Sequence, residues 1–575
     1  MTLSRREFLR VSAMGACTLV VSTGLSGCGS DESGVSVFFN HGVASGDPLK
    51  DKVIVWTRTT PSFSVDSLDV NYEVSTTSNF SNIVRNGVAK TSPEQDFTVK
   101  VDVQGLEAGT KYYYRFSSNG ATSVVGEMKT LPTGSVDKIK MAVFTCANYP
   151  NGYFNAYDMA SKIEDLDVTV HVGDYIYEYG MYENDDFEAK VPAYATKNAV
   201  KIGRALPTNN DKECIALEDY RRRYALYHTD EGLQAIHKAC PMIAVWDDHE
   251  IANDTYKGGA QNHDDTEGSF EERTAAALQA YFEWMPIRPI ANKEKIFRNF
   301  EFGDLISLNM LETRIFGRDK QLEYADYYTA TGFDGAKFFT DISSPTRTMM
   351  GAEQTDWLQS QIASSSATWL VLGQQVLMGR MSLPAELLAP TSTPALTAEL
   401  TLLKIKKLKG GVLTLEEETR LATAIPYNLD AWDGYPYERE VILGTAKAYN
   451  KNLVVLAGDT HNSWSSDLKD KDGNHVGVEF ASPSVTSPGL EEYLGLTTPE
   501  AVAQTEGAFT VLIDDLKYAN LSDRGFMEVV FTKNEVTSNW HHLSNYDSKS
   551  YTENVARAKS LKCLPGVANR KIVAV

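Results

Sequence analysis

The apolar and polar positions of the chain follow two different patterns. Between residues 36 and about 130, short runs of alternating apolar and polar residues are separated by turn residues, which is typical of antiparallel strands. The stretch Leu131–Gly134 carries the turn chemistry that closes this region. The pattern predicts a small all-β domain over residues 36–133, with strands in VIVWTR, VNYEVST, FTVKVDV and KYYYRFSS.

From Lys138 onward the pattern changes to apolar strands that alternate with helical periodicity, which indicates an α/β domain over residues 134–575. The strands are expected at 138–146, 168–174, 241–247, 305–312, 369–375 and 453–459. A helical insertion is expected at about 397–425, in two halves that flank a Gly-Gly turn. It is either a lid or partner surface, or an amphipathic hairpin packed on the domain.

The segment Leu106–Tyr114 allows a more specific prediction of the fold of the all-β region. It is similar to the segment before a late strand in fibronectin-type and immunoglobulin-like sandwiches, in which a tyrosine hydroxyl ties the corner. The alternative is a chance group of tyrosines on an edge strand. The resemblance implies that residues 36–133 form a small β-sandwich.

The N-terminal residues are predicted to be a targeting segment. Arg5 and Arg6 precede an apolar stretch that is too short to span a bilayer, which fits a twin-arginine export signal over residues 1–27. Leu25–Cys28 resembles a bacterial lipobox, in which Cys28 becomes the lipidated first residue, and 28–35 would be a tether. The alternative is a soluble helix with a chance arginine pair. We therefore expect export by the twin-arginine machinery and a periplasmic or cell-surface location, with membrane attachment through Cys28.

Charge and cysteine content limit the possible partners. The chain has 575 residues and a formal charge of −21, so no nucleic acid-binding surface is expected, and an anionic substrate must be held by local cations. Cys214 and Cys240 are either bridged or two buried thiols, because their spacing demands neither.

Four predicted strand ends carry polar clusters. Aspartate and histidine at one strand end are usually caps and turn residues, but four such clusters in one domain indicate a shared site. The clusters are Cys146-Ala147-Asn148, Gly173-Asp174-Tyr175-Ile176-Tyr177, Trp246-Asp247-Asp248-His249-Glu250 with Asn253, and Gly458-Asp459-Thr460-His461-Asn462.

The residue types in these clusters are consistent with two or more metal ions. Asp174, Asp248 and Asp459 supply hard oxygens, His249 and His461 supply imidazoles, Asn253 supplies a carbonyl, and Cys146 and Tyr177 can ligate as anions. Thiolate and phenolate favour ferric iron over magnesium. The oxygen ligands that remain suit calcium or another hard divalent ion.

These motifs resemble a known family. The stretch GDYIY matches the Gly-Asp-x-x-Tyr pattern of purple acid phosphatases, and the larger set is similar to the PhoD-like alkaline phosphatases over nearly the whole mature chain. That set includes FTCANYPNGYFNAY, VHVGDYIYEY, WDDHEIAND and VLAGDTHNSW. The resemblance implies a four-layer α-β-β-α metallophosphatase sandwich behind the N-terminal β-sandwich, and hydrolysis of phosphate esters.

The resemblance also implies roles for individual residues. Cys146, Asp174, Tyr177 and His461 would surround Fe³⁺, with Asp174 bridging towards one or two Ca²⁺ ions that Asp248, Asn253 and Asp459 complete. A metal-bound hydroxide is expected to attack phosphorus in line. His249 would contact the phosphate or protonate the leaving group, unless it is a supporting histidine or another ligand. Asn148 and Arg314 are further phosphate-contact candidates, although arginine at a strand end is more often a salt-bridged support.

Two other functions stay open at this point. One is a phospholipase-type phosphodiesterase at the membrane surface, suggested by the tether and the lid-like insertion. The other is a surface-anchored binding protein with structural metals, although structural calcium loops would not need a cysteine and a tyrosine beside the aspartate.

Overall fold

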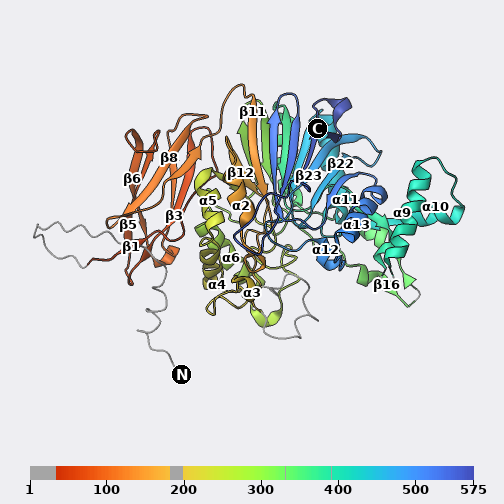
Figure 1. Cartoon of the computed structure of the whole chain (residues 1–575), viewed down its shortest axis with the longest axis horizontal. Helices are drawn as coiled ribbons and strands as arrows, with labels where there is room; N and C mark the ends of the chain where they lie inside the picture. Colours follow the sequence, from red (N-terminus) through yellow and green to blue (C-terminus); the bar gives the residue numbers. More distant parts are fainter. Residues whose placement is uncertain (1–33, 182–198, 331, 390–391) are drawn as a thin grey trace, which may run out of the picture.

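The computed structural model describes residues 34–181, 199–330, 332–389 and 392–575 (Figure 1). The predicted export signal and lipobox, including Cys28, lie outside the described residues. In the part of the chain that is described, no helix combines the length and the apolar character needed to cross a membrane.

The N-terminal region is all-β. Its two facing sheets enclose a core that includes Val55, Val70, Tyr114 and Phe116. The four predicted strands are present as β3, β5, β7 and β8, whereas the other strands of this region, including the nine-residue β6, were not predicted. The strands are β1 (Val37–Phe38), β2 (Val43–Gly46), β3 (Lys52–Arg58), β4 (Thr60–Pro61), β5 (Leu68–Ser75), β6 (Ile83–Thr91), β7 (Thr98–Gln104), β8 (Lys111–Ser118), β9 (Ala121–Thr122) and β10 (Gly126–Lys129).

The corner before β8 is tied by a tyrosine, as predicted. The backbone N–H of Glu107 donates to the Tyr112 hydroxyl at 2.9 Å, and the Tyr112 side chain is buried. Strand β8 lies between β10 and β5, so these tyrosines are not on an edge strand. The contact supports the β-sandwich interpretation of this region.

The α/β region consists of two sheets that pack face to face. One is part of a ten-stranded sheet and contains β11 (Lys138–Phe144), β12 (Val168–His171), β13 (Met242–Ala244), β25 (Gly525–Thr532), β26 (Val536–His542), β27 (Lys559–Cys563) and β28 (Val573–Ala574). The other has seven strands, β14 (Arg298–Phe302), β15 (Ile306–Met310), β18 (Trp369–Gly373), β21 (Leu453–Ala457), β22 (Ser463–Lys469), β23 (His475–Ala481) and β24 (Leu516–Asn520). Side chains from both sheets, such as Phe144, Leu308 and Val454, share one core.

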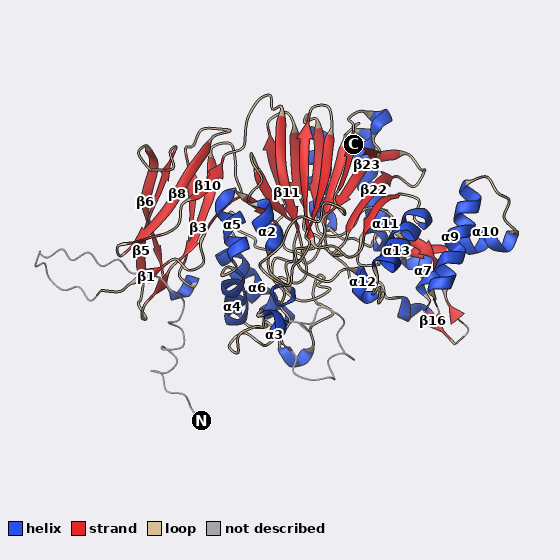
Figure 2. Ribbon diagram, viewed as in Figure 1, coloured by secondary structure: helices blue, strands red, loops and turns tan. Residues whose placement is uncertain are grey.

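Helices cover the outer face of each sheet, which gives the predicted α-β-β-α order (Figure 2). On one side lie α2 (Asn155–Ala160), α4 (Leu217–Tyr227), α5 (Glu231–Ala239) and α6 (Phe270–Trp284). On the other side α8 (Gly351–Ser364), α11 (Pro436–Ala448) and α13 (Pro499–Leu512) pack on the seven-stranded sheet over a second core that includes Leu358, Leu443 and Phe509. The predicted fold class is confirmed.

The two regions share a sheet, which the sequence analysis did not anticipate. Strand β13 pairs in parallel with β2 at Met242 and Gly46, so β2, β3 and β7 of the N-terminal region extend the sheet of the α/β region. A Cβ on Gly46 would lie 2.2 Å from the Pro286 carbonyl oxygen, so only glycine fits this close approach. The next residue, Asp47, pairs with Arg298 at 2.7 Å across the joint.

The helical insertion is a hairpin of α9 (Pro394–Leu408) and α10 (Leu415–Ala422), joined through Gly410 and Gly411. It rises from the short strand pair β19 (Ser382–Pro384) and β20 (Ala424–Pro426) and projects at the end of the molecule opposite the N-terminal sandwich (Figure 1). Leu400 is its one buried residue on α9, and Lys404 pairs with Asp514 at 2.7 Å. Smaller helices are α3 (Ala199–Ile202), α7 (Gly335–Ile342) and α12 (Leu490–Tyr493).

Candidate metal centre

The parallel strands of both sheets end on the same side of the molecule. The strands are shorter than predicted, so the polar clusters lie in the loops that follow them. Cys146 follows β11, Asp174 follows β12, Asp248 follows β13 and Asp459 follows β21. These loops lie below the sheets in the view of Figure 1. This is the edge at which α/β sheets place their ligands.

The local backbone is unusual at this edge. Cys146, Asp174, Asp459 and His461 all have φ between 56° and 64°, a left-handed conformation that non-glycine residues rarely adopt. Gly173 lets the loops approach each other, because a Cβ there would lie 2.4 Å from Cβ of Asp247. Such strain is found most often at functional sites, where the surrounding structure enforces it.

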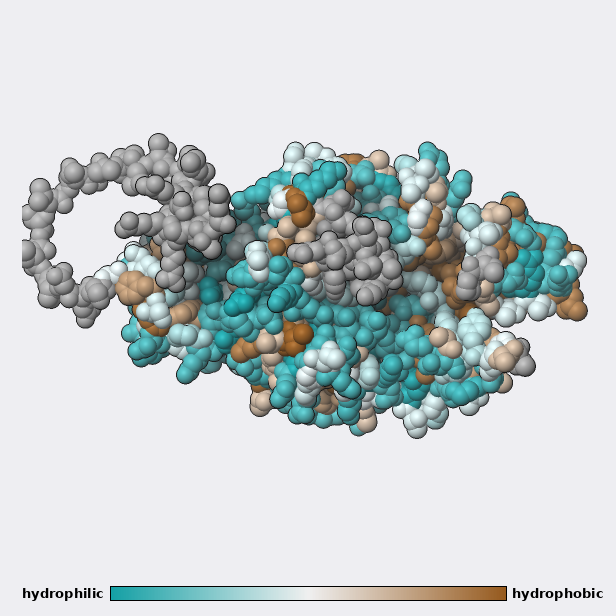
Figure 3. Space-filling view, turned by 90° about the horizontal axis from the view of Figure 1, so that it is seen from below, coloured by the Kyte–Doolittle hydropathy of each residue, from teal (hydrophilic) through white to brown (hydrophobic). Residues whose placement is uncertain are grey.

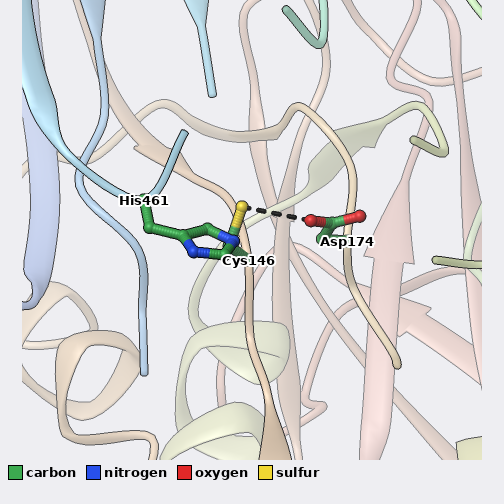
Figure 4. A group of neighbouring side chains, drawn as sticks. All are labelled: Cys146, Asp174 and His461. Carbon is green, nitrogen blue, oxygen red and sulfur yellow. Dashed lines mark hydrogen bonds between the residues drawn. The ribbon is translucent and has the colours of Figure 1, made fainter. Parts of the chain in front are cut away.

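Cys146, Tyr177 and His461 gather on one side of Asp174, and we call this group the sulfur end. Cys146 Sγ lies 3.2 Å and Tyr177 Oη 3.1 Å from Asp174 Oδ2, and Tyr177 Oη lies 3.1 Å from His461 Nε2. Figure 4 shows how Cys146, Asp174 and His461 point towards one another. All four side chains are buried.

Asp247, Asp248 and Asp459 gather on the other side, and we call this group the carboxylate end. The possible ligand atoms of these three residues lie within 4.8 Å of one another, and the same holds for Asp174, Asp248 and His249, and for Cys146, Asp174 and His461. Asp174 and Asp248 therefore each belong to two groups. A chain of overlapping groups has room for more than one cation.

The charges of the cluster show why it fits cations. Burial, opposed by His249 and reinforced by Asp248, raises the pKa of Asp174 well above its usual value. Burial together with Asp247 and Asp430 does the same to the pKa of Asp459. Burial and Asp174 raise the pKa of the Cys146 thiol. Each of these shifts favours the protonated form over the anion, and a bound metal ion would reverse that preference. The oxygen, sulfur and imidazole donors therefore suggest metal binding.

Arg314 lies among the carboxylates with its side chain fully buried. Its Nε bonds to Asp247, and its other two nitrogens lie 2.8 Å from Asp430 and 3.1 Å from Asp459. Burial would raise the pKa of Asp248, but Arg314 and His249 bring it below its usual value. This is the salt-bridged support that the sequence analysis left open for Arg314, and its direct contact with phosphate stays a prediction.

His249 faces the cluster from the carboxylate side and is held by a glutamate. Its Nδ1 lies 2.8 Å from Glu178 Oε2, and its ring stacks on that of Tyr177 with centroids 4.1 Å apart. Burial lowers the pKa of His249, but the charges of Asp248, Glu178 and Asp174 outweigh burial and raise it well above its usual value. The carboxylate of Glu178 can only accept, so Nδ1–H of His249 is the group that donates to it.

The two predicted asparagines have different hydrogen-bond partners. Asn148 is buried, and its backbone carbonyl accepts from the Thr486 hydroxyl at 2.7 Å. Asn253 donates its backbone N–H to Glu178 at 2.8 Å and its side-chain amide N–H to Gln261 at 3.0 Å. Phosphate contact by Asn148 and calcium ligation by Asn253 stay predictions.

Four supporting residues had no role assigned from the sequence. Glu178 orients His249, and Glu250 accepts the backbone N–H groups of the two ligand loops, from Asp174 at 3.1 Å and from Asp247 at 2.8 Å. Glu250 belongs to the third predicted cluster and Glu178 lies within the stretch VHVGDYIYEY, so the motifs contain both glutamates although they do not indicate their roles. Asp430 and Ser487 carry no such signal.

The remaining cysteines do not form a bridge. Cys214 and Cys240 are both free thiols in the described residues, and both are buried. Burial raises the pKa of each thiol to about 12. They are therefore inert packing residues rather than reactive groups.

Comparisons with known proteins agree with this geometry. The PhoD-like phosphatase family matches residues 141–540, and the N-terminal domain of PhoD-like phosphatases matches residues 27–132. Alkaline phosphatase D of Bacillus subtilis (strain 168) is 34% identical in an alignment of 511 positions, which covers 85% of this chain and 77% of that protein. A solved structure described as "Structure of PhoD" superimposes with a TM-score of 0.74 and 29% identity, over 95% of this chain and 93% of the other.

The four-layer fold, the clustered candidate ligands and these matches define a phosphoric ester hydrolase. The chain belongs to the PhoD-like phosphatase family. The family inferred from the sequence motifs is thereby confirmed.

Proposed function

We propose that this protein is a metal-dependent alkaline phosphatase or phosphodiesterase that carries Fe³⁺ at the sulfur end and one or two Ca²⁺ ions at the carboxylate end. Cys146, Tyr177, His461 and Asp174 would hold the iron. Asp174, Asp248, Asn253 and Asp459 would hold calcium. Membership of the PhoD-like family and the similarity to alkaline phosphatase D support the phosphatase activity.

One observation carries the proposal, namely that Asp174 belongs to two ligand groups of different chemistry. On one side it meets a thiol and an imidazole, and on the other it meets Asp248 and His249. Soft anionic donors and hard oxygens select different cations. When bound, such cations would neutralise the phosphoryl oxygens and supply a nucleophile at neutral pH.

The residues of the chain then have separate tasks. His249 is the proton donor of the site. Its Nδ1–H donates a hydrogen bond to Glu178, so in the protonated ring the hydrogen on Nε2 is the one available to a phosphoryl or leaving-group oxygen. Arg314 forms ion pairs with Asp247 and Asp459, which reduces the repulsion between the two carboxylates and fixes their positions. Burial of the ligand side chains excludes water, which strengthens every charge interaction in the site.

Elemental analysis combined with a visible absorption spectrum tests the proposal. Active protein should contain iron and show a phenolate-to-iron charge-transfer band, and both Cys146→Ser and Tyr177→Phe should reduce the iron content and the activity. The band should disappear in Tyr177→Phe. If both variants kept full iron and full activity, or if an active preparation were colourless and held zinc alone, the metal assignment would be wrong.

The α9–α10 hairpin favours a second candidate, a phospholipase-type diesterase. Leu402, Leu408, Val412 and Leu415 are all more than 60% exposed, and Figure 3 shows apolar side chains at the end of the molecule where this hairpin lies. Assays with a phosphomonoester, a diester and a phospholipid, run side by side, separate the two candidates. The binding-protein alternative is not carried further, because the family is one of phosphatases.

We also propose that the protein is exported by the twin-arginine route and held at a membrane by a lipid on Cys28. The support is the order of Arg5-Arg6, the apolar stretch and the lipobox in the sequence. Mass spectrometry of the mature N-terminus and fractionation of a Cys28→Ser variant test this. A soluble wild-type protein that retains residues 1–27 would contradict it.

A further inference from the structure

A buried strap crosses the sulfur end. The strap, residues 482–489, joins β23 to α12, and its members Ser484, Val485, Thr486 and Ser487 are all completely buried. None of these residues is one of the candidate ligands. Their place beside three of those ligands raises the question of what the strap does.

Main-chain hydrogen bonds fix the strap to the loop that carries Cys146. The N–H of Val485 donates to the Thr145 carbonyl at 3.0 Å, and the N–H of Ser487 donates to the Cys146 carbonyl at 3.3 Å. Within the strap, the Ser484 hydroxyl donates to the Ser487 carbonyl at 2.5 Å. Because both ends of these bonds are buried, the strap has a fixed position relative to Cys146.

From this position the strap contacts two of the ligands directly. The Pro488 carbonyl accepts Nδ1–H of His461 at 2.6 Å, which leaves the Nε2 lone pair of His461 facing Tyr177 Oη at 3.1 Å. The Ser487 hydroxyl oxygen lies 2.7 Å from Tyr177 Oη. A carbonyl behind a ligating imidazole is the arrangement that fixes its tautomer in metal sites.

The hydrogen of the Ser487 hydroxyl has two possible acceptors. The Cys146 carbonyl lies 3.0 Å from Ser487 Oγ, and Tyr177 Oη lies 2.7 Å away. A neutral Tyr177 can donate its own hydrogen, for example to Asp174 Oδ2 at 3.1 Å, whereas a phenolate can only accept. Of the two contacts, the one to Tyr177 Oη is the shorter, and in it the Ser487 hydroxyl is the donor.

We propose that Ser487 is a positioning residue of the sulfur end, which donates its hydroxyl hydrogen to the Tyr177 phenolate and so sets the orientation and donor strength of that ligand. The Pro488 carbonyl likewise sets the orientation of His461 by accepting its Nδ1–H. The inference rests on the proposed function, in which Tyr177 binds ferric iron as a phenolate.

The test compares Ser487→Ala with Ser482→Ala in the full-length, iron-loaded protein. Ser482 belongs to the same strap and is equally buried, but its hydroxyl donates to the Val143 carbonyl at 3.0 Å. In Ser487→Ala the charge-transfer band should move to longer wavelength, because the phenolate electrons lose a stabilising hydrogen bond. Iron should be retained about 10- to 100-fold more weakly against a chelator, the usual effect of removing an outer partner of a ligand. Ser482→Ala should leave both unchanged, and Ser487→Thr should keep the band position.

The outcomes separate this inference from the proposed function. A band in the wild type that is identical in Ser487→Ala and Ser482→Ala overturns the role of Ser487 and leaves the iron site standing. Iron-loaded wild type without any phenolate band overturns both. If Ser487→Ala does not fold, a measurement on the wild type tests the inference instead. Exchange into D₂O should shift the phenolate C–O stretch in the resonance Raman spectrum, and an unchanged stretch overturns the inference.

Discussion

The two ends of the cluster are held in different ways. At the sulfur end, neutral groups hold the ligands, with the Ser487 hydroxyl on Tyr177 and the Pro488 carbonyl on His461. At the carboxylate end a cation does this, since Arg314 forms ion pairs with four carboxylates. The carboxylate end therefore has a positive charge of its own, whereas the contacts of the sulfur end are to neutral groups. Under the proposed function, the more highly charged ion would bind at the sulfur end, and the divalent ion would bind at the carboxylate end.

Loss of Asp174 should impair metal binding at both ends, because Asp174 belongs to a candidate ligand group at each end. In Asp174→Asn we expect both metals to be lost and kcat/KM to fall about 10⁴-fold or more, since charge stabilisation by bound metals is worth several kcal/mol and about 1.4 kcal/mol corresponds to tenfold. Steady-state kinetics and metal analysis check this. Asp69→Asn, an exposed position on β5, is the control and should change neither. A variant that kept one ion and full activity would show that Asp174 does not link the ends.

Removal of Arg314 should affect the carboxylate end alone. In the metal-free protein we expect Arg314→Met to cost about 3–5 kcal/mol of unfolding free energy, because it leaves buried carboxylates without their partner. Denaturant unfolding measures this, and added Ca²⁺ should restore part of the loss.

The matched control for Arg314 is Arg420→Met on the α9–α10 hairpin. Arg420 pairs with Glu386 and Glu399, which are exposed, so its loss should cost no more than about 1 kcal/mol. Equal costs for the two arginines would mean that the charge balance of the carboxylate end is not what stabilises it.

Glu178→Gln should separate the role of His249 from metal binding. We expect kcat to fall about 10- to 100-fold with the metal content unchanged, because the variant loses the charge that holds Nδ1–H of His249. The exposed Glu218→Gln on α4 serves as the control. A fall in metal content without a fall in kcat per loaded site would instead make Glu178 a support of the ligands.

The stabilisation that cations give should grow with pH. Burial, opposed by Arg314, raises the pKa of Asp247 to about 7, and burial raises that of Glu250 to about 8. Between the unfolded values near 4 and these pKa values, the metal-free folded protein holds protons that the unfolded chain has released. Its stability therefore falls as pH rises, by up to about 1.4 kcal/mol per pH unit for each group.

Cations displace these protons, so their binding strengthens as pH rises. The Tm gain on adding Ca²⁺ should be larger at pH 8 than at pH 5, as measured by thermal unfolding at both values. An equal gain would mean that the carboxylates of this end do not exchange protons for the ion.

Much of the site could be predicted from the sequence because strand ends have a local signal. An apolar run followed by Cys146, Asp174 or Asp459 can be recognised without any knowledge of the fold, and parallel strands bring such ends to one edge. The tyrosine corner at Tyr112 was equally local. The assignment of each residue as a ligand is a prediction that the metal experiments above test.

The supports of the site could not be predicted in the same way. Ser487 lies 341 residues from Cys146 in the sequence, and Asp430 follows the α9–α10 insertion, so their contacts depend on the packing of both sheets. The shared sheet was missed for a similar reason, because one residue pair between Gly46 and Met242 leaves no trace in the local pattern.

That shared sheet has a consequence for any shortened form of the protein. Strand β13 has only three residues, and β2 covers its outer side. If the first 133 residues were removed, β13 would become an open edge with unpaired backbone N–H and C=O groups, which invites strand addition by another chain. The N-terminal sandwich covers this edge, so a truncated chain should self-associate more strongly than the full chain in gel filtration.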